Sequence, residues 1–149
     1  MKAVIQRVSY ASVTVDNKSI SKIDKGLLIL LGITHTDTKD DIEWLTKKIA
    51  NLRIFDDDQN TMNRSLLDIA GSAIVVSQFT LMANTKKGNR PSYIKAANAE
   101  IAIPLYENFI SEFESVLGKK VGTGVFGANM NIELQNDGPV TIVIDTQNK

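Results

Sequence analysis

Three polar residues, Ser77, Gln78 and Thr80, lie near the end of an otherwise apolar segment that runs from Ser72 to Met82. Burying a polar group costs free energy unless it finds a hydrogen-bond partner, so placing three of them here by chance would be costly. Together with the intervening Phe79 they are the first candidates for a site. The structural alternative is that Gln78 and Thr80 only bond neighbouring loops.

A second candidate segment is Asn136-Asp137-Gly138-Pro139-Val140-Thr141. Proline removes a backbone donor, and the bond that precedes it has access to the cis form. Taken alone, however, an Asp-Gly pair between two alternating segments is typical of a hairpin turn. The local pattern therefore predicts a C-terminal hairpin, with strands over 129–135 and 140–144.

The usual hydrolytic groups are nearly absent from the chain. It contains no cysteine, and His35 is its one histidine, which excludes thiolate catalysis and a zinc site built from paired histidines. A Ser-His-Asp triad could use only His35, and no serine stands in a Gly-x-Ser-x-Gly elbow. We interpret the carboxylate pairs in Asp56-Asp57-Asp58 and Asp40-Asp41 as a turn and a helix start.

Composition and charge limit the class of protein. The chain has 149 residues, 43% of them hydrophobic, which suits one core and one domain over 1–149. We find neither a membrane-spanning apolar run nor a signal-peptide pattern, so we expect a cytoplasmic protein that does not act at a membrane. The formal net charge is +0, yet no acid occurs between Asp68 and Glu100, a window that contains Lys86, Lys87, Arg90 and Lys95. This basic loop permits an RNA ligand.

Hydrophobic periodicity predicts the elements that must position these candidates. Alternation predicts an N-terminal hairpin over 3–15 and 19–23, and continuous apolar runs predict buried strands over 27–33 and 72–82. Helical spacing predicts helices over 39–52 and 101–116, the first with a Thr38/Asp41 capping box and the second stopped by Gly118. The expected fold is α/β, or α+β on a stricter reading, with a mixed sheet and two main helices.

The sequence resembles the D-aminoacyl-tRNA deacylase family from end to end. The motifs that carry the resemblance are Ala3-Val4-Ile5-Gln6-Arg7-Val8, Lys25-Gly26-Leu27-Leu28, Leu52-Arg53-Ile54-Phe55, Ser77-Gln78-Phe79-Thr80-Leu81, Lys87-Gly88-Asn89-Arg90-Pro91-Ser92, Thr123-Gly124-x-Phe126-Gly127-Ala128-x-Met130 and Asn136-Asp137-Gly138-Pro139-Val140-Thr141. The departures fall outside the two candidate segments. Asn84 and Asn129 stand where the family pattern leads us to expect Asp, and Tyr93 stands in place of a common Phe.

The resemblance implies a curved sheet and a homodimer with its active sites at the subunit interface. Gln78, Phe79 and Thr80 would form the catalytic segment, with backbone N–H groups near Phe79 and Thr80 stabilising the oxyanion. The substrate-binding residues implied are Ser77, Arg7, Phe126, Met130, Gly138 and Pro139, the Gly-Pro pair entering from the partner in the cis form. The ligand would be the 3′ end of aminoacylated tRNA, and the family is similar in using no cofactor, metal or covalent nucleophile.

Other functions remain open at this point. A non-catalytic tRNA-binding module would need the basic loop but not the polar strand end, and a hydrolase of free small esters or peptides would need the reverse. A closer alternative is the paralogous editing enzyme that has a trans Gly-Pro and clears misacylated L-threonyl-tRNA. Ser77 and Phe79 argue against it, because Pro and Ala are expected at those places.

Overall fold

The sheet is built around its first strand, β1 (Lys2–Val15), in the computed structural model, which describes residues 1–149. Along one edge β1 pairs antiparallel with β8 (Asn131–Asp145). Along the other edge it pairs first with β3 (Gly26–Gly32) and then with β2 (Lys18–Ile23). The pairing of β1 with β2 confirms the predicted N-terminal hairpin.

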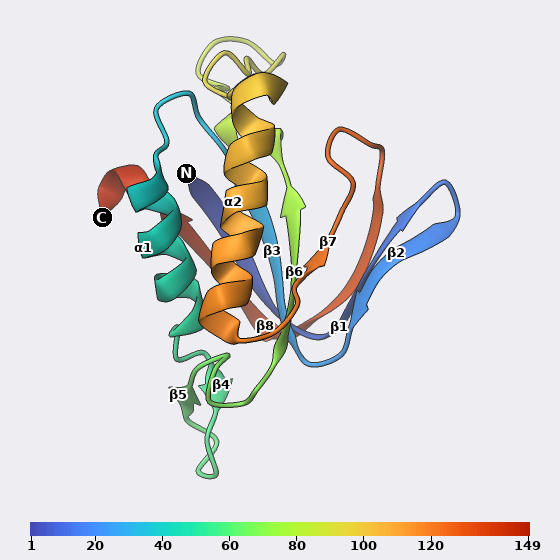
Figure 1. The fold of residues 1–149 in the computed structure, drawn as a ribbon, viewed down its shortest axis with the longest axis vertical. Coiled ribbons are helices and arrows are strands. Elements are labelled where there is room, and N and C mark those ends of the chain that lie inside the picture. Colours follow the sequence, from blue (N-terminus) through green and yellow to red (C-terminus); the bar gives the residue numbers. More distant parts are fainter.

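Beyond β3 the sheet continues with two parallel strands, β6 (Ser72–Ser77) and β7 (Gly122–Thr123). It curves until β7 lies beside β2 (Figure 1). There the Ser21 hydroxyl donates to the Thr123 carbonyl oxygen at 2.6 Å and accepts from the Thr123 N–H at 2.9 Å. A side chain thus supplies the partners that a strand would otherwise give, and the sheet is nearly closed.

The two helices, α1 (Lys39–Ala50) and α2 (Ala99–Leu117), pack against each other over one face of the sheet (Figure 1). Successive strand residues point to opposite faces, so the sheet carries two cores. The larger core lies under the helices, and the smaller lies inside the curve and includes Val13, Leu28 and Ile74. No helix is both long enough and apolar enough to span a membrane.

The predicted C-terminal hairpin is wrong, because β8 is one strand that runs antiparallel to β1 throughout. Val8 faces Asn136 and Gln6 faces Thr141, so residues 137–140 lie opposite Arg7 alone. Both arms pair with the same partner in the same direction, and the extra residues therefore bulge out of the ladder instead of reversing the chain.

Other element boundaries also differ from the predicted ones. β6 ends at Ser77 rather than at Met82, and Phe79–Met82 forms a short 3₁₀ turn, η1. α1 ends at Ala50, and Ile101 is 37% exposed because α2 buries the neighbouring Ala102 instead. The remaining short elements are β4 (Phe55–Asp56), β5 (Met62–Arg64) and η2 (Thr146–Asn148). The expected mixed α/β architecture with a curved sheet and two main helices is confirmed.

Asp41 fixes the start of α1 and generates a first prediction. Its carboxylate accepts from the Thr38 N–H at 2.9 Å and pairs with the Lys149 ammonium at 2.9 Å. Burial raises the pKa of this carboxyl, but hydrogen bonds from Lys149 and Thr38 outweigh burial and bring the pKa well below its ordinary value of 3.8. We therefore expect Asp41→Asn to cost about 1 kcal/mol of unfolding free energy at pH 7.

A carboxyl whose pKa is lowered by folding stabilises the fold above its unfolded pKa, and this contribution is lost as the pH falls below about 4. Urea unfolding at pH 7 and at pH 3 should show the gap between wild type and Asp41→Asn narrowing at the lower pH. Asp40→Asn, an exposed neighbour in the same helical turn, is the matched control. An equal gap at both pH values would contradict the role given to the Asp41 charge.

Candidate active site

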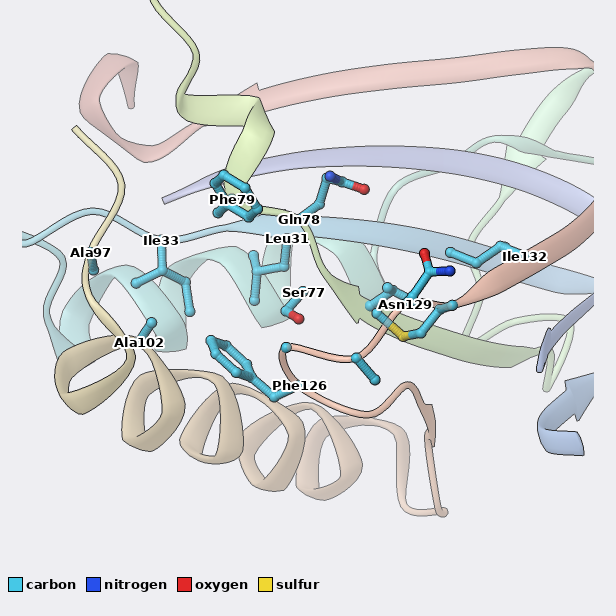
Figure 2. A pocket seen from close by; sticks show the side chains of 14 residues that line it. Leu31, Ile33, Ser77, Gln78, Phe79, Ala97, Ala102, Phe126, Asn129 and Ile132 are labelled. Atoms are coloured by element: carbon cyan, nitrogen blue, oxygen red, sulfur yellow. The ribbon is translucent and has the colours of Figure 1, made fainter. Parts of the chain in front are cut away.

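A cavity of about 290 Å³ lies where β6 ends, between the first turn of α2 and the segment that leads into β8 (Figure 2). Most of its wall is apolar, with Leu31, Ile33 and Ala102 among the lining residues. Ser77, Gln78 and Asn129 add polar groups to this wall. An apolar hollow with a few placed polar groups is the usual form of a small-molecule site, and its size is close to the lower end of the common range of about 300–1,000 Å³.

The polar segment predicted from the sequence lines this cavity in part. The Gln78 N–H donates to the Leu31 carbonyl oxygen at 2.8 Å, so pairing with β3 continues one residue past the end of β6. The chain then turns into η1, which carries the Phe79 ring toward the cavity (Figure 2). Ser77, Gln78 and Phe79 line the hollow, whereas Thr80 does not, and its hydroxyl accepts a hydrogen bond from the Gln78 amide.

Phe79 lies at the mouth of the cavity rather than in a core. The side chain is 57% exposed, and its ring meets the Tyr93 ring edge to face, with 5.0 Å between centroids. Tyr93 therefore supports Phe79 from the basic-loop side of the site. An exposed aromatic ring at the rim of an apolar hollow gives a flat ligand a surface on which to stack.

Phe126 and Met130, the two apolar residues named for substrate binding, both line the cavity on the segment before β8. Phe126 packs against Tyr106 of α2, with 6.0 Å between ring centroids. Met130 is packed so close to Gly124 that a Cβ atom on that glycine would lie 2.4 Å from the Met130 sulfur. Glycine at position 124 thus allows Met130 to reach the cavity.

Tyr106, a buried residue of α2 that packs against Phe126, was not among the site residues predicted from the sequence. Its hydroxyl donates to the Val75 carbonyl oxygen at 2.7 Å and thereby ties the helix to β6 two residues before Ser77. Burial raises the pKa of Tyr106 to about 12. The available signal was a single polar aromatic residue among the apolar positions of the second helix, since a buried tyrosine hydroxyl needs a partner.

Gly138 and Pro139 do not line the cavity of their own chain; they lie in the bulge of β8, joined by a cis peptide bond. The side chain of Arg7 holds this bulge in place. It is almost fully buried, and its guanidinium donates to the Asp137 carbonyl oxygen at 3.0 Å and to the Ile54 carbonyl oxygen at 2.8 Å. The predicted link between Arg7 and the Gly-Pro segment is present, while the link between that segment and the polar strand end is absent within one chain.

The other charged residues singled out in the sequence lie outside the cavity. His35 is exposed in the loop after β3, and the carboxylate of Asp57 accepts the N–H groups of Gln59 and Thr61 within a turn. The expected structural role of the acidic run is therefore confirmed. In the basic loop Lys86, Lys87 and Arg90 are all exposed, and none of them forms an ion pair.

Tyr106→Phe is the variant that isolates the hydroxyl contact to Val75. Leaving the buried carbonyl without a partner should cost about 1–3 kcal/mol of unfolding free energy near neutral pH. Folding raises the pKa of this tyrosine above its ordinary value of 10.0, so the contribution is present below pH 10.0 and is lost as the pH rises toward 12. Urea unfolding at pH 7 measures the loss, with Tyr10→Phe at an exposed position as the control. Equal stability of the two variants would contradict the assignment.

Comparison with known proteins places the chain in a family. The sequence pattern of the family described as D-Tyr-tRNA(Tyr) deacylase matches residues 4–145. A D-aminoacyl-tRNA deacylase of Flavobacterium psychrophilum is 65% identical over 149 residues, which cover 100% of this chain and 99% of the relative. One from Bacteroides fragilis (strain YCH46) is 62% identical with the same coverage.

A solved structure shares the fold of this chain. The structure of a c-Myc DNA Unwinding Element Binding Protein is 40% identical and superposes with a TM-score of 0.93, covering 98% of this chain and 99% of that chain. The polar strand end, the loop with Phe126 and Met130, and the Arg7-supported bulge all fall within the matched range of residues 4–145. The chain therefore belongs to the D-aminoacyl-tRNA deacylase family, a family of hydrolases.

Proposed function

We propose that residues 1–149 form one deacylase domain that hydrolyses the ester bond of D-aminoacyl-tRNA in the cytoplasm and releases the D-amino acid. The observation that carries the proposal is the cavity at the end of β6, which combines an apolar wall with Ser77 and Gln78 and with the exposed Phe79 ring. The terminal adenosine would lie against Phe126 and Met130. The ester would then lie near the start of η1.

Backbone groups are proposed to carry the catalysis. The first N–H groups of a helical turn have no partner within it. In η1 these are the N–H groups of Phe79 and Thr80, and no hydrogen bond links either of them to the rest of the chain. They are free to donate to the oxyanion that forms when water attacks the ester carbonyl, and one such donor is commonly worth about 10²–10³ in rate. The free ribose hydroxyl of the tRNA would assist the water.

Chirality is proposed to be read by exclusion. In a homodimer, the Gly138-Pro139 bulge of one subunit would enter the cavity of the other, and its carbonyl oxygens would fill the space that an L side chain needs. Arg7 supports this role by fixing the carbonyl of Asp137, and the second edge of β8 has no partner strand within the chain. Glycine has no side chain to exclude, so glycyl-tRNA, including tRNA for alanine mischarged with glycine, should also be cleaved.

Matched esters of tRNA test the function directly. Hydrolysis of D-tyrosyl-tRNA and glycyl-tRNA, with L-tyrosyl-tRNA and L-threonyl-tRNA left intact, is the expected pattern. Preference for L-threonyl-tRNA would identify the paralogous editing activity instead. Binding without hydrolysis would identify a tRNA-binding module, and equal cleavage of a free D-tyrosine ester would identify a general esterase.

Thr80→Ala tests whether the hydroxyl of Thr80 takes part in the reaction. Because the hydroxyl lies outside the cavity wall and the proposed donors are backbone groups, we expect single-turnover hydrolysis of D-tyrosyl-tRNA to slow by no more than about tenfold. Loss of an essential nucleophile would cost several orders of magnitude. A loss on that scale in a folded variant would make Thr80 the nucleophile.

Gly138→Ala tests the chirality device. A Cβ atom there would lie 2.8 Å from a methyl carbon of Val140 and 3.0 Å from an Arg7 nitrogen, and the φ of 127° is one that L residues rarely adopt. The bulge must shift, so the ratio of kcat/KM for D-tyrosyl-tRNA over L-tyrosyl-tRNA should fall by at least about tenfold, equivalent to 1.4 kcal/mol. Gly118→Ala, with φ of 67° and open space around it, is the control.

Mixed dimers then test where the bulge acts. Subunits with Gly138→Ala are combined with subunits whose cavity is filled by Ser77→Trp. If the two parts of one site come from different chains, each heterodimer regains one discriminating site. Heterodimers that form but stay without D-specific activity would refute the cross-subunit arrangement.

A further inference from the structure

A second hollow, of about 320 Å³, lies next to the cavity and differs from it in chemistry. Lysines reach it from three parts of the chain: Lys2 at the start of β1, Lys86 in the basic loop and Lys95 before α2. Neutral polar residues fill much of the remaining wall, among them Thr34 and Asn84. A hollow of this composition suits an anion rather than an apolar group.

The charge of the hollow is positive after its one acid is counted. Asp145 also lines it and pairs loosely with Lys2, at 3.8 Å between the ammonium nitrogen and the nearer carboxylate oxygen. Lys86 and Lys95 have no carboxylate within ion-pair distance. These two ammonium groups are therefore available to an outside anion.

The wall beside Lys86 is held in place by local hydrogen bonds. The Asn84 side-chain oxygen accepts from the Lys86 N–H at 3.0 Å, and Asn84 and Ser92 exchange backbone hydrogen bonds of 2.8 and 3.0 Å across the base of the loop. The backbone from which the Lys86 side chain extends is consequently held in place. Less of the side chain's freedom has to be lost when it binds an anion.

The hollow and the cavity share a thin wall. Ile33 lines the cavity and the next residue, Thr34, lines the hollow; Ala97 lines the cavity, and Lys95, two residues earlier, lines the hollow. An isolated backbone bridge joins Thr34 to Ala96 between them. A ligand that fills the cavity and continues over this wall reaches the lysines directly.

We infer that the hollow binds a backbone phosphate of the substrate RNA, next to the terminal nucleotide that occupies the cavity. The inference rests on the proposed function, since it assigns the cavity to the terminal adenosine. Single-stranded RNA carries a phosphate directly before its last nucleoside. This phosphate would supply the negative partner that Lys86 and Lys95 lack within the chain. The hollow would therefore favour an aminoacyl ester on an RNA chain over the same ester on free adenosine. The cavity alone does not make this distinction.

Two synthetic substrates provide the test: the D-tyrosyl ester of adenosine, which has no phosphate, and the D-tyrosyl ester of the trinucleotide CCA. The readout is the ratio of kcat/KM for the trinucleotide ester over the adenosine ester. Lys86→Ala/Lys95→Ala should lower this ratio by about tenfold, the value of one charge-assisted hydrogen bond to phosphate. Asp145→Asn should raise it, because the competing carboxylate charge is removed.

Lys22→Ala is the matched control, an exposed lysine without an ion pair on β2, at the other end of β1. In the wild type, the log-log salt dependence of kcat/KM should be steeper for the trinucleotide ester, by about 0.7 for each phosphate contacted. In the double variant this difference should shrink. The two lysine changes and the acid change must therefore move the ratio in opposite directions.

Failure of the proposed function and failure of the phosphate site give different results. A wild-type protein that cleaves neither ester and also leaves D-tyrosyl-tRNA intact contradicts the proposed function itself. Cleavage of both esters with a ratio that the double variant leaves unchanged, or that Asp145→Asn lowers, removes the phosphate from the hollow while the function stands. A ratio that falls equally in Lys22→Ala would show general screening of charge instead of a site.

Discussion

Hydrogen bonding along both edges of β1 is the constraint on which the remaining structure depends. One edge is satisfied by β8 alone, while the other is divided between β3 over the first half of β1 and β2 over the second half. Buried backbone groups need partners, so the sheet bends where the partner changes. The bend brings β2 to β7 and nearly closes the sheet. The cavity lies beside this curve, where β6 ends and η1, α2 and the segment before β8 continue the wall.

Because β7 is short, the end of β6 at the candidate site has no neighbouring strand on one side. β7 pairs with only two residues of β6, Ile74 and Val75, so the backbone of β6 beyond them has no strand on that side. The Tyr106 hydroxyl satisfies the Val75 carbonyl oxygen, and the chain then leaves the sheet through η1. The N–H groups of Phe79 and Thr80, the first two of η1, have no partner at the end of this buried strand. Under the proposed function these fixed dipoles replace acid-base side chains, none of which lines the cavity.

The parts of the fold that follow from local pattern were predictable. Alternation in β1, the apolar run of β3 and the spacing in both helices each reflect burial that a short window of sequence records. The bulge in β8 was not predictable in this way. Asn136-Asp137-Gly138-Pro139 has the composition of a hairpin turn, and only the pairing of both flanking arms with β1, which is distant in sequence, overrides it.

The candidate site was likewise predictable from local sequence only in part. Ser77 and Gln78 drew attention because polar residues at a buried strand end are costly, and both line the cavity. Thr80 satisfied the same criterion and lies outside the wall, because β6 stops earlier than its apolar composition suggests. Lys95 was noted only as part of the acid-free window and Lys2 gave no signal, since their shared hollow depends on three segments meeting in space. Sequence reports the burial of a residue better than it reports the neighbours that a distant segment brings.

The way in which Arg7 holds the bulge limits what the proposed device can distinguish. The guanidinium donates to the carbonyl oxygen of Asp137 in the bulge, and contacts with the Ile54 carbonyl oxygen and, at 3.5 Å, with Asp56 hold the guanidinium itself in place. Under the proposed function, the carbonyl oxygens of Gly138 and Pro139 beside this contact would exclude any side chain that enters their space, whatever its size or polarity. Such a gate reads the configuration at one carbon atom and not the identity of the amino acid. A device that would reject L residues in this way should therefore leave the cavity tolerant of many D side chains, and of glycine.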